Sequence, residues 1–261
     1  MSWSLLGAQF CLELSFGVLV ALAFVPKAPV GTLFYRLMGS SAMVLGLVAL
    51  GLLLRTEGAS WSQPSVLAAA LAMIGYPLYS GPLRGWRWGA GLAWSMVATA
   101  AAVVLILRRT LEDPGGVDLA LASYSALSTG AVAGSVGLAM VLGHWYLTVP
   151  NLNVSHLSRL NRVTVGAMLS SLLGVGLTVV WHREAFELAS TPLLGPWGMF
   201  YFGTRLTVGL FLPLLFAWMT AGSLKFKNTR SATGILYAST VLVLIGTAVS
   251  VSLQSSYKVP L

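Results

Sequence analysis

The sequence predicts an all-α membrane protein with eight transmembrane helices in one bundle, and three observations support this prediction. The 261 residues are 57% hydrophobic and only 8% charged, whereas soluble domains carry about 25% charged residues. Apolar stretches of about 18 or more residues recur along the chain, each long enough to cross a hydrocarbon core of about 30 Å. These stretches lack the alternation of barrel strands, so helices must satisfy the backbone in lipid.

The expected spans follow one another with short connections that carry prolines, glycines or charged runs. They cover residues 4–25, 33–54, 65–83, 87–107, 119–147, 161–182, 196–222 and 231–253. The first span contains Glu13 and lacks a basic segment before it, so we expect a retained helix rather than a cleaved signal peptide. No polar segment is long enough for a soluble domain, and residues 1–261 are therefore expected to form a single polytopic transmembrane domain.

The fifth span is expected to be the centre of the bundle, and the third and seventh spans are expected to be broken. Residues 119–147 form the longest apolar run and end in the polar and aromatic segment His144-Trp145-Tyr146 before Pro150. Pro77 and Pro213 lie inside the third and seventh spans, where a proline removes a backbone hydrogen bond. Pro77 lies in the third of the first four spans, and Pro213 lies in the third of the last four.

The charges sort by side of the membrane. The end opposite the termini collects nine basic residues and no acidic ones: Lys27, Arg36, Arg84, Arg87, Arg159, Arg162, Lys225, Lys227 and Arg230. The end with the termini collects five basic and six acidic residues: Arg55, Arg108, Arg109, Arg183, Lys258, Glu57, Glu112, Asp113, Asp118, Glu184 and Glu187. The positive-inside rule then places both termini on the outer, periplasmic side of the cell inner membrane. This topology explains the net charge of +8, so no nucleic-acid partner is expected.

Two ionisable residues inside the spans are the first candidate site. Glu13 and Arg205 each lie about ten residues from the outer end of their spans, at a depth of roughly 15 Å. An unpaired ion at that depth is costly, so we expect the two to pair and their spans to be neighbours. Tyr201 is one turn from Arg205 on the same face. This face suits a proton or quinone head-group site, or an ion pair that only orients the bundle.

The inner rim around His144 is the second candidate site. Gly130, Gly134 and Gly137 allow close helix packing, and His144 lies two turns beyond Gly137, so we expect it to point into the bundle. Tyr146, His156 and Arg159 follow nearby and suit a quinone or a polar head group. A packed histidine, interfacial aromatic residues and a solvated loop are the structural alternatives.

Residue content argues against an intrinsic cofactor. The single cysteine, Cys11, excludes a disulfide and a Cys-ligated metal cluster, and no CxxCH haem motif is present. The three histidines do not share one depth within the bundle, which argues against bis-histidine haem b. No metal site is expected and quinone is the favoured ligand, while an axial haem or chlorophyll ligand at His144 is a further alternative.

These features favour a membrane subunit of a respiratory or photosynthetic electron-transfer complex. In span number, short loops and outward termini the chain resembles the eight-helix membrane anchors of the polysulfide, nitrite and dimethyl sulfoxide reductase families. The resemblance implies a quinone-interacting subunit whose partners carry cytochrome or iron–sulfur cofactors, and the chain would be at most the quinone-binding anchor of an oxidoreductase. The alternatives are a small-solute or proton-coupled transporter and a cofactor-free scaffold subunit. Membrane lipids are partners in every case.

Overall fold

The structure is a computed structural model in which every described element is a helix. It describes residues 3–56, 58, 60–111, 114–149, 152–183, 186, 192–193 and 195–258. Pro150, Asn151 and five of the acidic residues assigned above to the outer end lie outside these residues: Glu57, Glu112, Asp113, Glu184 and Glu187. Seven helices of the described part are long and apolar enough to cross a membrane, which confirms a helical membrane bundle.

The helices follow the expected spans, with ends that differ by a few residues. In chain order they are α1 (Trp3–Leu22), α2 (Lys27–Val30), α3 (Thr32–Leu53), α4 (Pro64–Ala72), η1 (Met73–Gly75), α5 (Tyr76–Ser80), α6 (Trp86–Thr110), α7 (Gly116–Thr148), α8 (Ser155–Trp181), α10 (Pro196–Leu206), η2 (Thr207–Phe211), α11 (Leu212–Lys225) and α12 (Thr229–Tyr257). The largest difference is α8, which begins six residues before the expected position because the Asn153 side chain accepts a hydrogen bond from the Ser155 amide. Such a bond satisfies one free amide at a helix start.

Both helices that contain an interior proline are interrupted just before it. The third expected span, Pro64–Ser80, is shorter than the seven long helices, and its 3₁₀ turn η1 precedes Pro77. In the seventh span the π-helical segment η2 precedes Pro213. A proline cannot donate to the carbonyl four residues earlier, and a locally tighter or wider turn accommodates this loss.

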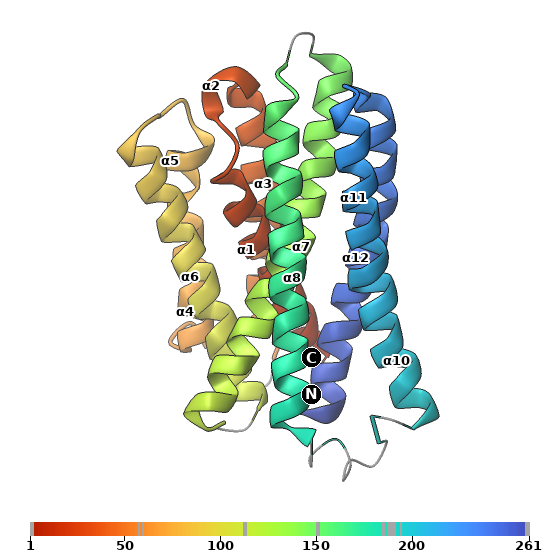
Figure 1. The fold of residues 1–261 in the computed structure, drawn as a ribbon. Coiled ribbons are helices and arrows are strands. Elements are labelled where there is room, and N and C mark those ends of the chain that lie inside the picture. Colours follow the sequence, from red (N-terminus) through yellow and green to blue (C-terminus); the bar gives the residue numbers. More distant parts are fainter. Residues whose placement is uncertain are drawn as a thin grey trace.

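The described helices are arranged in two halves. α1, α3, α4–α5 and α6 pack in a ring, and α7, α8, α10–α11 and α12 pack in a second ring with the same order of neighbours. α1 contacts α7 and α12 across the seam between the halves, and α6 contacts α7. α7 crosses the bundle obliquely (Figure 1). It is also the most buried of the seven long helices, as expected for the centre of the bundle.

The seam between α1 and α7 is a backbone-to-backbone contact made by glycines. A Cβ atom built on Gly134 would lie 2.0 Å from the Gly17 carbonyl carbon, and one on Gly130 would lie 2.3 Å from the Glu13 carbonyl oxygen. Small residues allow helices in lipid to approach this closely. This contact therefore fixes the position of α1 along the axis of α7.

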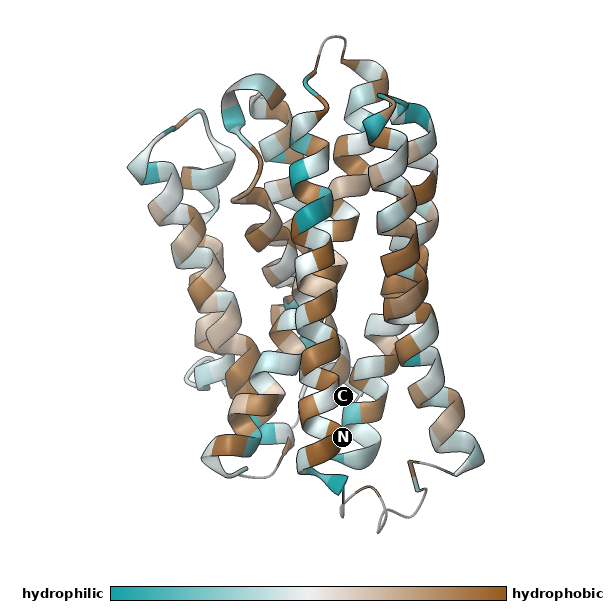
Figure 2. Cartoon of the chain, in the orientation of Figure 1, coloured by the Kyte–Doolittle hydropathy of each residue, from teal (hydrophilic) through white to brown (hydrophobic). Residues whose placement is uncertain are grey.

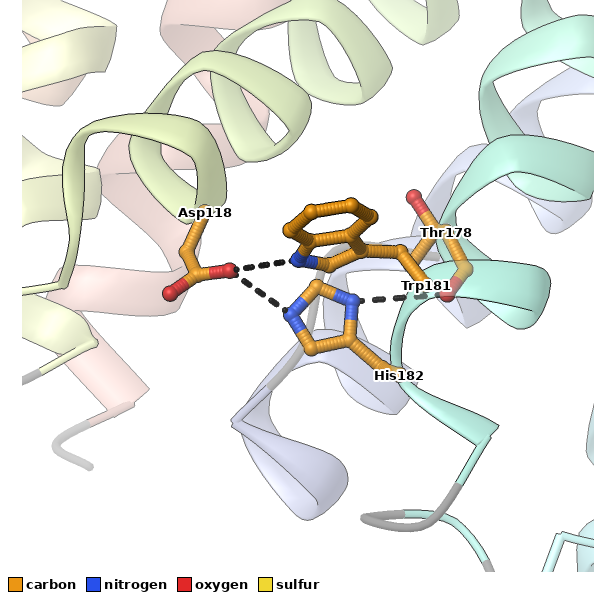
Figure 3. Close-up of polar contacts among 4 residues, drawn as sticks. All are labelled: Asp118, Thr178, Trp181 and His182. Carbon is orange, nitrogen blue, oxygen red and sulfur yellow. Dashed lines mark hydrogen bonds and ion pairs between the residues drawn. The ribbon is translucent and has the colours of Figure 1, made fainter.

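Polar residues gather towards the two ends of the bundle, with apolar residues between them (Figure 2). The first helix begins and the last helix ends at the same end (Figure 1). At that end Asp118 of α7 joins the end of α8 (Figure 3). Its Oδ1 atom accepts a 3.2 Å hydrogen bond from Trp181 Nε1 and lies 3.2 Å from His182 Nε2. His182 Nδ1 lies 3.3 Å from the Thr178 carbonyl oxygen.

This contact ties the start of α7 to the end of α8.

Replacing Asp118 by alanine should lower stability only slightly. The contact is partly exposed, with 40% of the Asp118 side chain accessible, and such pairs contribute about 0–1 kcal/mol. Thermal unfolding of the purified protein should show a decrease of a few degrees at most, and Trp181→Phe, which removes only the indole hydrogen bond, should have a smaller effect. A loss as large as those given in the Discussion would show that this contact holds the bundle together.

Candidate functional site

A buried polar cluster lies on the seam between the two halves. Its members come from α1, α7, α8, α10 and α12, and each is less than 7% exposed: Gln9, Glu13, Thr129, Ser171, Arg205 and Gln254. Buried polar groups in a membrane bundle are costly unless they are paired, and they are a marker of functional sites. We call these six residues the seam cluster.

The carboxylate side of the seam cluster is a chain of three side chains. Gln9 Nε2 donates to Glu13 Oε1 at 2.8 Å and to Gln254 Oε1 at 2.8 Å. The chain therefore links α1 to α12. Within the described structure, Glu13 Oε2, Gln9 Oε1 and Gln254 Nε2 are buried without a hydrogen-bond partner. These atoms leave hydrogen-bonding capacity unused at both ends of the chain.

The guanidinium side of the seam cluster is held by two hydroxyl groups. Arg205 Nη2 donates to Thr129 Oγ1 at 2.7 Å and to Ser171 Oγ at 2.9 Å. Arg205 is 1% exposed, and its Nε atom has no partner among the described residues. Gly209, one turn on, is in backbone contact with Gly246 of α12, since a Cβ on Gly209 would lie 2.8 Å from the Gly246 Cα.

Glu13 and Arg205 lie at the same level, as expected, but they do not form the expected direct pair. Glu13 contacts α7 at Gly130, and Arg205 contacts the adjacent Thr129. The two charges interact electrostatically, yet no hydrogen bond or ion pair joins these two described residues. The reason is that α1 packs chiefly on α7 and α3, while α10 packs on α12, so the first and seventh spans are not the close neighbours that were expected.

A groove runs beside the seam cluster at the end of the bundle that carries the termini. Two cavities of about 420 and 450 Å³ lie on either side of α12 and share Ser252 and Ser256. Aromatic residues of α1 and α10 form the outer walls, and hydroxyl groups of α12 form the floor: Trp3, Phe10, Trp197, Tyr201, Ser252, Ser255 and Ser256. We call this feature the α12 groove. Tyr201, 44% exposed, lines it.

The seam cluster and the α12 groove use the same two helices. Gln9 lies between the groove residues Leu6 and Phe10 along α1, and Gln254 precedes the groove residue Ser255. Neither glutamine lines the groove, and their hydrogen bond joins α1 to α12 beside it. A buried chain of three polar side chains, Gln254, Gln9 and Glu13, therefore lies next to the groove.

His144 does not point into the bundle, contrary to the expectation. It is exposed, and its Nδ1 atom lies 3.3 Å from the Tyr237 hydroxyl of α12. Gly130 and Gly134 pack tightly, but a Cβ on Gly137 would meet nothing within 4 Å. The side of α7 that carries Gly137 and His144 is therefore open, and the line of glycines does not remain buried along its whole length.

The other inner-rim candidates belong to separate local contacts. Tyr146 donates a hydrogen bond to the Asn153 carbonyl oxygen, which closes the α7–α8 connection. His156 is partly buried, and its Nδ1 has no partner in the described part of the chain. Arg159 lines a different cavity with Lys27 and Arg84. The structure thus brings Glu13, Arg205 and Tyr201 to one region and places His144, Tyr146, His156 and Arg159 at the opposite rim.

Four members of the seam cluster were not predicted: Gln9, Thr129, Ser171 and Gln254. The spacing of Gln9 and Glu13 by four residues places both on one helix face and is the signal that was available for Gln9. Among the described residues, no group of three or more His, Cys, Asp or Glu side chains is arranged to hold a metal ion.

The fold and the site define a polytopic helical membrane protein with a buried charged cluster beside an amphipathic groove. A scan against protein-family models and searches of curated proteins and of solved structures found no match. The function is therefore argued from the site alone.

Proposed function

We propose that the chain is a quinone-interacting membrane subunit of an electron-transfer complex, and that the α12 groove receives the quinone head group. The observation that carries this proposal is the buried polar chain of Gln254, Gln9 and Glu13 on α1 and α12, the same helices that line the groove. Aromatic walls suit a flat ring, hydroxyl groups suit its carbonyl oxygens, and the apolar surroundings suit a prenyl tail. Electrons would pass to cofactors of partner subunits, such as cytochrome or iron–sulfur proteins.

In this proposal the residues of the chain bind the head group and carry protons. Tyr201, Ser252 and Ser255 donate hydrogen bonds to the ring oxygens, whereas the Ser256 hydroxyl donates to the Ser252 carbonyl oxygen. Glu13 Oε2, which has no partner within the described residues, is the atom that would accept a proton released from the ring. Gln9 and Gln254 position the Glu13 carboxyl group and do not relay that proton, because Gln9 Nε2 is the donor in both hydrogen bonds. Arg205 interacts electrostatically with Glu13, which stabilises the arrangement of the two residues at the seam.

The proposal includes a location and an orientation. The connections at the end opposite the termini contain basic residues and no acidic residues, which favours the cytoplasmic side of the inner membrane for that end. The α12 groove would then face the outer side. Protons removed from a quinol in this groove would be released outside.

Photolabelling with an azido-quinone tests the groove. We expect the full-length protein, purified in mild detergent, to be labelled on the peptides that carry Tyr201 and Ser252, and unlabelled quinone should compete. Tyr201→Phe removes one hydrogen bond and should reduce labelling by about two- to tenfold. Trp86→Leu, at an exposed position of the opposite end, is the matched control. Labelling spread evenly over the lipid-facing surface would contradict the proposal.

A second measurement separates binding from proton transfer. Glu13→Gln should leave quinone labelling unchanged, because Glu13 does not line the groove. In the native membrane complex, the same variant should lower quinol turnover by about a hundredfold or more, the size of a general-base contribution. Co-purification followed by mass spectrometry identifies the partner subunits.

A proton-coupled transporter is the second candidate, and the broken helices favour it. The third helix of each half is interrupted, at η1 and at η2, and such breaks are common at transporter binding sites. Solute counterflow by the chain reconstituted alone would favour this function over the first. If substitution of Glu13 affected assembly and nothing else, a scaffold subunit would remain.

A further inference from the structure

We propose a second binding site, for the phosphate head group of an anionic phospholipid, at the end of the bundle opposite the termini. A cavity of about 450 Å³ lies there between the end of α1, the start of α6 and the start of α8. Three cations line it: Lys27, Arg84 and Arg159. We call it the basic cavity. It is independent of the α12 groove and of the function proposed for that groove.

Lys27 fixes the shape of the basic cavity. Its ammonium group donates hydrogen bonds to the carbonyl oxygens of Gly81 and Leu83, the latter at 2.7 Å. These bonds hold the α5–α6 connection against α2. Gly85 closes the connection with φ +73°, a conformation that favours glycine. Arg84 therefore lies in the α5–α6 connection between the carbonyl groups bound by Lys27 and the turn at Gly85.

The charges in the basic cavity are not balanced within the protein. Burial and the neighbouring charge of Arg84 lower the pKa of Lys27. Arg84 and Arg159 are exposed, and neither has a hydrogen-bond or ion-pair partner among the described residues. The connections at this end, residues 23–31, 81–85, 149–154 and 226–228, contain no Asp or Glu. A bound anion would relieve the mutual repulsion of these cations, and phosphate is the anion that arginine binds best through paired N–H groups.

The walls of the basic cavity identify a lipid rather than a free phosphate. Ala23, Phe24, Val25 and the ring of Trp88 line it beside the cations. Phe24 is 42% exposed, and Trp88 is held by a 3.1 Å hydrogen bond from its indole to the Tyr79 carbonyl oxygen. An apolar wall next to a cationic one suits the glycerol and first acyl carbons of a phospholipid, and tryptophan favours this depth of the membrane.

Lipid binding by charge-removal variants tests this site. The full-length protein in a neutral detergent is titrated with phosphatidylglycerol and followed by native mass spectrometry. We expect Arg84→Gln and Arg159→Gln each to weaken binding about fivefold, and the double variant about 25-fold, since each basic side chain near an anionic surface contributes about that much. Both residues are exposed, so the variants should unfold at the wild-type temperature in detergent without added lipid.

Arg87→Gln is the matched control. Arg87 is three residues from Arg84, exposed, stacked 5.8 Å over the Trp86 ring, and does not line the cavity. It should bind phosphatidylglycerol like wild type. Equal weakening by Arg87→Gln and by the double variant would overturn the site, because it would show a diffuse charge effect. Equal binding of phosphatidylcholine, or stabilisation by inorganic phosphate at the same concentration without any by phosphatidylglycerol, would overturn the assignment to an anionic lipid.

Discussion

Replacing Gly134 by alanine should destabilise the bundle by about 3 kcal/mol or more, the upper end of overpacking costs. The added methyl group would lie 2.0 Å from the Gly17 carbonyl carbon and 2.2 Å from the Val18 amide nitrogen. Both atoms are backbone, so no side chain can move aside, and α1 must separate from α7. Thermal unfolding of the purified protein in detergent, with the yield of monodisperse protein, measures the effect.

Gly137→Ala is the matched control on the same helix. Nothing lies within 4 Å of its Cβ position, and alanine is favoured over glycine in a helix by about 1 kcal/mol. This variant should be as stable as wild type or slightly more stable. If Gly134→Ala and Gly137→Ala unfold at the same temperature, α1 and α7 do not meet at their backbones.

Replacing Arg205 by methionine should cost about 3 kcal/mol or more, because each buried hydroxyl group left without its partner costs about 1–3 kcal/mol. The change leaves the hydroxyl groups of Thr129 and Ser171 without their donor, and leaves Glu13 without the cation that attracts it. We expect a large decrease in unfolding temperature. Arg162→Met, at an exposed position of α8, should change it little.

The double variant Glu13→Gln with Arg205→Met tests whether the two charges depend on each other. Removing both charges should restore part of the stability lost in the single Arg205 variant, because no buried charge is then left without its opposite. The double-mutant cycle should give a coupling energy of about 1–2 kcal/mol, within the range for residues of one network. Strictly additive effects would show that each residue is stabilised by its own helix partners alone.

The sequence predicted the membrane bundle because hydrocarbon thickness imposes a length on each apolar run. This constraint acts on each segment separately, so the seven long helices could be located from the sequence. The longest apolar run indicated that α7 is the centre of the bundle. The interruption of the third span was less visible. Pro77 indicated a break, but how far the helix would be shortened depends on packing around Met73 and Gly75 rather than on composition.

The candidate site could be predicted in part. Glu13 and Arg205 are conspicuous because ionisable residues are rare in apolar spans, and their common level follows from counting residues. The partners of each charge are uncharged, and polar residues such as Thr129 and Ser171 are ordinary in spans, so only tertiary packing shows which of them face the cluster. The prediction that His144 points into the bundle was wrong for the same reason. The line of glycines defines a face of α7, but it does not show how far a neighbouring helix covers that face.

The division of the seam cluster between the two halves has a consequence for synthesis. Glu13 belongs to the first helix, whereas Arg205 follows 192 residues later (205 − 13). At a synthesis rate of about 5–20 residues per second, Arg205 is made roughly 10–40 s after Glu13. When spans enter the bilayer as they are made, the first half is inserted with Glu13 unmatched. Gln9 lies on the same helix as Glu13 and is present throughout this interval, whereas Arg205 and Gln254 complete the seam cluster only when the last helices are inserted.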